Sequence, residues 1–207
     1  MQFLDRGIKF LSHVDDSLKP LVSILDSREG TQEQSLSEAL MQSIVSQQLS
    51  TKVAAVIWER FKNLFPLKVP DNTTIQSYSD THLRQIGLSY SKIAYIRNVS
   101  AYFADSKIES LDWSKLEDAE IISRLTSIKG VGVWTVQMIL IFHLESPDVW
   151  PVKDLGIQQS FARLKNIDPK DKYLINMMED QALKWSPHRS TAALALWNWK
   201  NIGYPDF

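Results

Sequence analysis

Hydrophobic and polar residues follow one another along the chain with the spacing of α-helices. A Ser35-x-x-Glu38 capping box begins one helix, and the polar run SQQLS at 46–50 interrupts it. Ser50 can cap a second helix, which Pro66 and Pro70 follow. The positions of these two helices that we expect to face inward are Leu36, Leu40, Ile44, Val45, Val53, Val56, Ile57 and Phe61.

The rest of the chain predicts further helices, and convincing strand alternation is missing. Helical patterns cover 80–86, 93–105, 118–125, 133–144, 170–185 and 187–200, and another helix opens at Asp154 with Ile157, Phe161 and Leu164 inward. Residues 1–16 are amphipathic as well. Gly87 and Pro147 end two of the helices. We therefore expect an all-α protein of about ten helices.

A Gly-x-Gly turn separates the helices predicted at 118–125 and 133–144. Gly130 and Gly132 have no Cβ, so the backbone can approach another surface closely there. The amides of such a turn, with those that begin the next helix, suit a phosphate. Asp154 comes later, at the start of another helix. This layout predicts chemistry on a nucleic acid, with a plain N-cap aspartate as the alternative reading of Asp154.

The charge balance does not by itself favour DNA binding. The chain has 23 Lys and Arg against 24 Asp and Glu, a net charge of −1, with an isoelectric point of about 6.4. A DNA-binding protein needs a basic face rather than a basic total. Residues that could form such a face, or else an ordinary solvated surface, are Lys129, Lys153, Lys165, Lys184, Arg189 and Lys200.

Several classes of site are excluded by what the sequence lacks. Cysteine is absent, which rules out disulfides, thiol chemistry and a Cys-ligated iron–sulfur cluster. The four histidines lack metal-ligand spacing, so no catalytic metal is expected. No run of 18 apolar residues occurs, and Asp5 and Asp15 make the N-terminus unlike a signal peptide. We expect a soluble, intracellular protein without a membrane span.

Five segments together resemble the helix-hairpin-helix DNA glycosylases. They are SQQLS at 46–50, LRQIGLSYSKIAYI at 83–96, LTSIKGVGVWTVQMILIF at 125–142, PDVWPVKDLGI at 147–157 and WSPHRS at 185–190. Over about 34–199 the chain is most similar to the 3-methyladenine (alkylpurine) type. The resemblance implies two helical bundles with a DNA-binding cleft between them. Residues 36–146 would form one, with the helix-hairpin-helix, and residues 1–35 plus 147–207 the other, with Asp154. A mixed α/β N-terminal domain is expected to be absent.

The resemblance also implies roles in catalysis. Asp154 matches the carboxylate that stabilises the oxocarbenium-like sugar and orients or deprotonates water. Bifunctional relatives have a nucleophilic lysine two residues after the second glycine, where this chain has Trp134, so no AP-lyase activity is expected. Trp134 and Trp197 match aromatic pocket positions that would stack on a cationic base. Met138 stands where some relatives have a tyrosine.

DNA contacts are implied for two further segments. Gln48, beside Gln47 and Leu49, matches the side chain that fills the gap left by a flipped base, with a plain polar loop as the alternative. The expected phosphate-binding residues are Lys129, Gly130, Gly132 and Thr135. The carbonyls of Thr126, Ile128 and Val131 match a site that holds a structural Na⁺ or K⁺ in relatives.

Together these features predict a monofunctional DNA-3-methyladenine (alkylpurine) glycosylase of base excision repair, which flips damaged bases and leaves an abasic site. Double-stranded DNA with alkylated bases is the expected partner, and we expect a monomer without a catalytic cofactor. Its location would be cytoplasmic, at the nucleoid, in a bacterium and nuclear in a eukaryote. The alternatives are a glycosylase for another damaged purine and a non-catalytic helix-hairpin-helix DNA-binding protein. The preference among 3-methyladenine, 7-methylguanine, ethenoadenine and hypoxanthine is left open.

Overall fold

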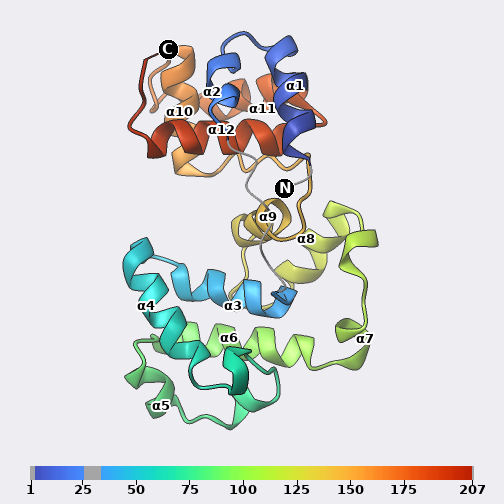
Figure 1. Ribbon diagram of the computed structural model, residues 1–207, viewed down its shortest axis with the longest axis vertical. Helices are drawn as coiled ribbons and strands as arrows, with labels where there is room; N and C mark the ends of the chain where they lie inside the picture. The colour runs from blue at the N-terminus through green and yellow to red at the C-terminus, as the bar shows by residue number, and fades with distance from the viewer. Residues whose placement is uncertain (1–2, 26–33, 207) are drawn as a thin grey trace. The chain divides into compact units, whose positions relative to one another are not determined.

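The computed structural model describes residues 3–25 and 34–206 (Figure 1). These residues form twelve α-helices and three short 3₁₀ helices, and they contain no strand. The predicted all-α class is therefore confirmed. None of the described helices is both long and apolar enough to cross a membrane.

The chain packs as two compact units, one formed by both ends of the chain and one by its middle. The first, the terminal unit, comprises Met1–Gln32 with Leu140–Phe207, and the second, the central unit, comprises Glu33–Ile139. The sequence-based division at 36–146 differs by assigning residues 140–146 to the central unit. The boundary in the structure falls inside one helix, α9 (Val133–Phe142), which the prediction had kept whole.

The central unit is built around two helices that pack against each other, α3 (Leu36–Ser46) and α6 (Tyr90–Phe103) (Figure 1). Leu40, Met41 and Ile44 of α3 are completely buried. The Ser35 hydroxyl accepts a hydrogen bond from the amide of Glu38, as the capping box predicts. The other α-helices of this unit are α4 (Thr51–Lys62), α5 (Asp80–Gln85), α7 (Ser106–Glu109) and α8 (Asp118–Thr126). The 3₁₀ helices are Pro66–Lys68, Thr74–Ser77 and Trp113–Lys115.

The orientation of α4 corrects the sequence reading. Ser50 caps this helix through the amide of Val53, as expected. Val53 and Val56, however, are 45% and 46% exposed rather than inward. The buried face instead holds Ala54, Ile57, Trp58 and Phe61. These four residues have the i, i+3, i+4, i+7 spacing of a single stripe, which leaves no room on that face for the two valines.

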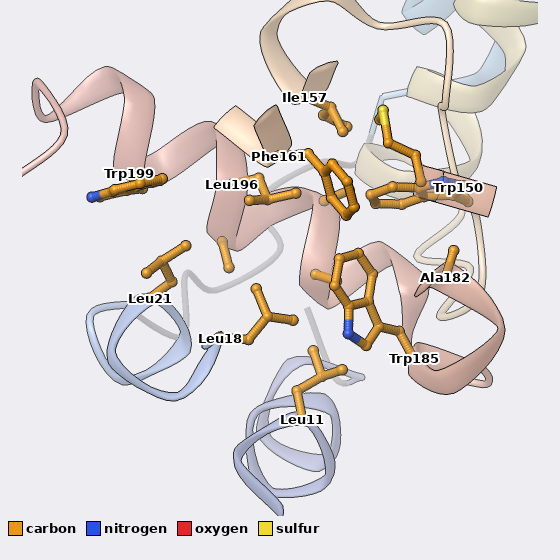
Figure 2. Close-up of a cluster of buried hydrophobic side chains, with 14 of the residues drawn as sticks. Leu11, Leu18, Leu21, Trp150, Ile157, Phe161, Ala182, Trp185, Leu196 and Trp199 are labelled. Carbon is orange, nitrogen blue, oxygen red and sulfur yellow. The ribbon is translucent and has the colours of Figure 1, made fainter. Parts of the chain in front are cut away.

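The terminal unit contains α1 (Leu4–Val14), α2 (Lys19–Ser23), α10 (Leu155–Lys165), α11 (Leu174–Trp185) and α12 (Arg189–Asn201). Figure 2 shows its core, where side chains from both ends of the chain meet. Trp185 is fully buried in this core, with the Trp150 ring edge-on at 5.2 Å between centroids. Burial of a large apolar side chain contributes about 1.5–3 kcal/mol each. This core therefore joins the N-terminal helices to the half of the chain that carries Asp154.

Several predicted helix ends are shifted in the structure, including both ends of the helix predicted over 93–105, which is α6. The helix predicted over 133–144 ends at Phe142, that over 170–185 begins at Leu174, and that over 187–200 begins at Arg189. Before α11, the Asp171 carboxylate accepts a hydrogen bond from the amide of Tyr173, a local turn that competes with helix. Such side-chain turns delay the start of a helix without changing its buried face.

A buried carboxylate ties the turn after α1 to two later helices. Asp15 accepts hydrogen bonds from the Trp185 indole N–H at 3.0 Å and from the Gln181 amide at 2.9 Å. The Lys165 ammonium lies 3.5 Å from the same oxygen, and Ser17 donates to the other one. Burial alone would raise the pKa of Asp15, but these hydrogen bonds and the lysine charge lower it overall. Asp15 is therefore an ionised, fully partnered group within the terminal unit.

Candidate active site and nucleic-acid interface

Asp154 is the N-cap of α10 and is half-buried in the terminal unit. Its Oδ1 accepts a hydrogen bond from the Ile157 amide at 2.9 Å. The same oxygen accepts a second one from the Trp197 indole N–H, also at 2.9 Å. The two donors belong to α10 and α12 and hold this oxygen from both helices. Asp154 is thus a carboxylate held at a defined place.

Trp197 is engaged in two contacts within this unit. Besides its hydrogen bond to Asp154, its ring stacks on the Phe142 ring, with centroids 5.7 Å apart and planes 27° apart. Gly156 lies close by, since a Cβ added there would be 3.0 Å from Asp154 Oδ1 and 3.3 Å from the Trp197 ring. A side chain at position 156 would therefore crowd both groups. The prediction assigned Trp197 to the base pocket, and sequence reasoning missed its direct bond to Asp154.

The predicted hairpin lies in the central unit, between α8 and α9. Ile128 and Val131 are buried, whereas Lys129 and Gly132 are exposed. Gly130 has φ +105°, a backbone conformation that disfavours other residues. Nothing lies within 4 Å of a Cβ added at Gly132. The turn therefore exposes Lys129 and Gly132, whereas Ile128 and Val131 attach it to the core of the unit.

Thr135 differs from the other three predicted phosphate ligands. Its side chain is only 3% exposed, within the first turn of α9. The first amides of a helix have no partner within the helix. The backbone N–H of Thr135, rather than its hydroxyl, is thus the group that fits the predicted role.

Three residues of α6 for which no role was predicted support this hairpin and the end of α3. The Asn98 side chain donates to the Lys129 carbonyl at 2.9 Å. The Tyr95 ring lies where a Cβ of residue 130 would be, at 2.2 Å from that position. The Lys92 ammonium donates to the Val45 carbonyl at 2.8 Å, at the end of α3, and burial lowers the pKa of this lysine. The spacing 92, 95, 98 was the one available signal, since it follows one face of a helix.

The residues predicted to fill the gap of a flipped base follow α3 directly. Gln47 is its C-cap and is half-buried. Gln48 is exposed with φ +59°, an uncommon backbone conformation for a residue other than glycine. Leu49 is exposed as well. The loop thus presents Gln48 and Leu49 to solvent.

The two predicted pocket residues of α9 lie four positions apart and share one side of that helix. Trp134 is 44% exposed, and Met138 is half-buried. Part of the Trp134 ring is therefore open to solvent. The buried Trp58 and Trp113, in contrast, are part of the core, as the sequence analysis expected.

The basic residues considered for a DNA-binding face divide into two groups. Arg189 pairs with Asp148, Lys165 bonds to Asp15 and Ser17, and Lys200 donates to Gln159. These three are committed to contacts inside the protein. Those that are exposed are Lys129, Lys153 and Lys184.

The carbonyls predicted to hold a monovalent cation lie around the turn after α8. Thr126 is the last residue of that helix, where terminal carbonyls have no intrahelical donor. The Ile128 carbonyl accepts a hydrogen bond from the Val131 amide at 3.0 Å. A carbonyl oxygen has two lone pairs, so this bond does not prevent it from binding a cation. Carbonyl oxygens are ligands that Na⁺ and K⁺ can take, and a cation at this turn stays a prediction.

The chain is similar to known DNA repair proteins over most of its length. Residues 41–187 match the family model described as HhH-GPD superfamily base excision DNA repair protein. DNA-3-methyladenine glycosylase 1 of Schizosaccharomyces pombe is 31% identical over 194 residues, which cover 90% of this chain and 83% of that protein. A structure of a 3-methyladenine DNA glycosylase from the same yeast, in complex with abasic DNA, matches with a TM-score of 0.83 at 28% identity. That match covers 98% of this chain and 100% of the other. A DNA-3-methyladenine glycosidase from Bacillus halodurans gives 0.81 at 29% identity, with 96% and 92% covered.

Proposed function

We propose that this chain, which belongs to the HhH-GPD superfamily of base excision DNA repair proteins, removes alkylated purines from duplex DNA by hydrolysis. The observation that carries the proposal is Asp154, a carboxylate held at the start of α10 by the Ile157 and Trp197 N–H groups. Relatives and solved structures named as 3-methyladenine glycosylases support the choice of substrate class.

Asp154 acts on the sugar side of the N-glycosidic bond. As the bond to the base breaks, positive charge develops on C1′ and the ring oxygen, and a fixed carboxylate stabilises it. Both described hydrogen bonds are to Oδ1. They orient the carboxylate before the substrate arrives, so little reorganisation is needed in the transition state. The same group orients or deprotonates the attacking water.

Base selection rests on the charge of the damaged base. Purines alkylated at N3 or N7 are cationic, and an indole face attracts a cation by about 1–2 kcal/mol. Trp134 offers such a face at the surface of α9, beside Met138. Trp197 is a second indole to which we assign a contact with the base. Because these bases also leave easily, stacking and one carboxylate suffice without a general acid.

Duplex DNA is the partner in this proposal, and the protein acts as a monomer. The exposed hairpin, through Lys129, Gly132 and the first amides of α9, binds a backbone phosphate. Gln48 and Leu49 fill the space that the flipped nucleotide leaves. A Na⁺ or K⁺ bound by the Thr126, Ile128 and Val131 carbonyls would stabilise the turn and takes no part in the reaction.

The reaction stops at the abasic site. A lyase step needs an amine that forms a Schiff base with C1′, and position 134 is a tryptophan. Lys153 is exposed next to Asp154, and we assign it to phosphate binding. Borohydride should therefore trap no covalent enzyme–DNA complex on an abasic or alkylated duplex. A trapped adduct at Lys153 would show that the enzyme is also a lyase.

Release of free base from methylated duplex DNA tests the proposed function directly. The purified protein should release 3-methyladenine, measured by chromatography, and nothing from the same duplex left unmethylated. Release only from duplexes with hypoxanthine or ethenoadenine would indicate a glycosylase for another damaged purine. Binding to an abasic-site duplex without release from any substrate would indicate a non-catalytic DNA-binding protein.

A further inference from the structure

The run Trp185–Ser190 joins α11 to α12 and reaches back to the segment that leads into Asp154. The Arg189 guanidinium binds Asp148 with two nearly parallel hydrogen bonds, Nε to Oδ1 at 2.7 Å and Nη2 to Oδ2 at 2.8 Å. The Arg189 amide also donates to Oδ1, at 3.2 Å, and the Ser186 hydroxyl donates to Oδ2, at 2.9 Å. Burial alone would raise the pKa of Asp148, but these donors lower it overall.

Ser190 adds backbone contacts beside this ion pair. Its buried hydroxyl accepts from the Val149 amide at 2.9 Å and donates to the Ser146 carbonyl at 2.7 Å. Its own amide donates to the Pro147 carbonyl at 3.0 Å. Residues 146–149 are therefore fixed to the first turn of α12 by both side-chain and backbone groups.

The same helix holds Asp154 itself, at the other end of the segment. Trp197 follows Arg189 by eight residues, so their positions lie about 12 Å apart along the axis of α12. The Trp197 N–H donates to Asp154, while Arg189 holds Asp148. Between these two points, Trp150 is buried against Trp185, and Gln158 donates to the Val152 carbonyl at 2.9 Å. Residues 148–154 thus run between two fixed attachments to one helix.

We propose that Arg189, Asp148 and Ser190 are positioning residues for Asp154. They attach residues 146–149 to the start of α12, so that the segment delivers the carboxylate to the Trp197 N–H at the reaction site. The effect of this attachment on catalysis rests on the proposed function. The attachment itself can be measured without the reaction.

The choice of residue types agrees with a positioning role. An arginine fork fixes both the distance and the plane of the carboxylate that it binds, whereas a lysine fixes only a distance. Arg189 and Asp148 are part-buried, so water screens this pair less than it screens a pair on the surface.

The first experiment observes the Trp197–Asp154 hydrogen bond by NMR in the free protein. The indole N–H resonance of Trp197 is assigned by its loss in Trp197→Phe. We expect Arg189→Lys and Ser190→Ala to shift this resonance toward the position of an unbonded indole. The Trp199 indole N–H, which donates to the Pro205 carbonyl from the same helix, should not move and is the internal control. An unshifted Trp197 resonance in both variants would overturn the proposal.

The second experiment measures single-turnover excision of 3-methyladenine at saturating enzyme. We expect Trp197→Phe, which keeps an aromatic ring but lacks the donor, to lower the maximal rate by about tenfold. Arg189→Lys should lower it by about fivefold, with an almost unchanged Kd for abasic-site DNA. In the Trp197→Phe background, Arg189→Lys should have little further effect, because both changes loosen the same carboxylate.

Two matched variants separate positioning from general stability. Trp199→Phe removes an indole donor from the same helix, and Arg124→Lys weakens an ion pair with Glu120 in the other unit. Both should keep the maximal rate, with melting temperatures measured alongside. The proposal is overturned if the unfolded fraction of Arg189→Lys accounts for its loss of excision rate. It is also overturned if the rate of the double variant Trp197→Phe/Arg189→Lys falls by the product of the two single losses. A wild-type protein without excision would refute the proposed function, while the NMR shifts would still decide the attachment.

Discussion

Asp154 and the hairpin, in different units of the molecule, differ in the kind of group that the structure holds in place. In the terminal unit, side chains hold the candidate catalytic group, with Trp197 on Asp154 and Arg189 on Asp148. In the central unit, the candidate DNA-binding groups belong mainly to the backbone. There Gly130 packs on Tyr95, and Asn98 binds the Lys129 carbonyl.

The difference follows from what each group has to do. A carboxylate that stabilises charge must keep its position, and directional hydrogen bonds from other side chains can fix it. Backbone amides that bind a phosphate must instead stay uncovered, which requires small residues at the turn and support from beneath. Substitutions in the terminal unit should therefore affect catalysis and stability, whereas those at the hairpin surface should affect DNA affinity.

The largest effect is expected for Asp154→Asn. Asparagine is an equally good N-cap and can accept both hydrogen bonds, so folding and affinity for abasic-site DNA should be preserved. The negative charge is lost, and the excision rate should fall by about 100-fold or more. Base release and DNA affinity are to be measured on the same preparation. Excision of 3-methyladenine close to the wild-type rate would contradict the catalytic assignment.

Asp15→Asn should give the second largest effect, as a loss of stability. The new amide group would face the Lys165, Gln181 and Trp185 donors, which the carboxylate now satisfies. Leaving buried donors unsatisfied costs about 2–3 kcal/mol of unfolding free energy. Urea denaturation at pH 7 measures this cost. A change below about 0.5 kcal/mol would show that the network contributes little.

The same residue predicts a pH dependence. The pKa of Asp15 is lower in the folded protein than in the unfolded chain. The stability that its carboxylate contributes is therefore complete above the unfolded pKa of about 4, and it is lost as the pH falls through the lower folded pKa. Wild-type stability should therefore fall more steeply than that of Asp15→Asn below about pH 4. Asp71 is the control: hydrogen bonds from Thr73 and Thr74 lower its pKa to about 2, yet it is exposed. Asp71→Asn should cost less than about 1 kcal/mol.

The two hairpin glycines should respond differently. At Gly130, alanine must adopt a positive φ, and its Cβ would collide with the Tyr95 ring, so Gly130→Ala should lose about 2 kcal/mol of stability. Gly132→Ala meets no atom and should fold normally. Gly132→Asp should also fold, but it should weaken binding to damaged and undamaged duplexes alike, since phosphate contacts carry no sequence information. Unchanged affinity for an abasic-site duplex would show that the hairpin is only a structural turn.

The smallest effect, and the most specific one, is expected for Trp134→Leu. This side chain is exposed, so the melting temperature should change little. Loss of the cation–π interaction should slow 3-methyladenine excision by about tenfold, and hypoxanthine excision by less, because hypoxanthine is neutral. Equal losses on both substrates, together with a lower melting temperature, would mean that Trp134 supports the fold rather than the base.

Features that depend on a few neighbouring residues could be predicted from the sequence. The caps at Ser35, Ser50 and Asp154 each bond to an amide three residues later, so the pattern of side chains determines them. The all-α class follows from the same local spacing. Val53 and Val56 show the limit, because apolar type alone does not reveal which face of α4 meets the core.

Contacts between distant residues were decided only by the tertiary structure. Trp197 bonds Asp154 across 43 positions, Arg189 bonds Asp148 across 41, and Asn98 bonds Lys129 across 31. A tryptophan, an arginine or an asparagine has many possible partners, and its own position in the chain does not select one. The packing of α12 within the terminal unit, and that of α6 within the central unit, selects the partner, because each brings a donor within bonding distance of one acceptor. The chemistry of each side chain could thus be assigned from the sequence, whereas the partner and the orientation of that side chain were decided by the tertiary structure.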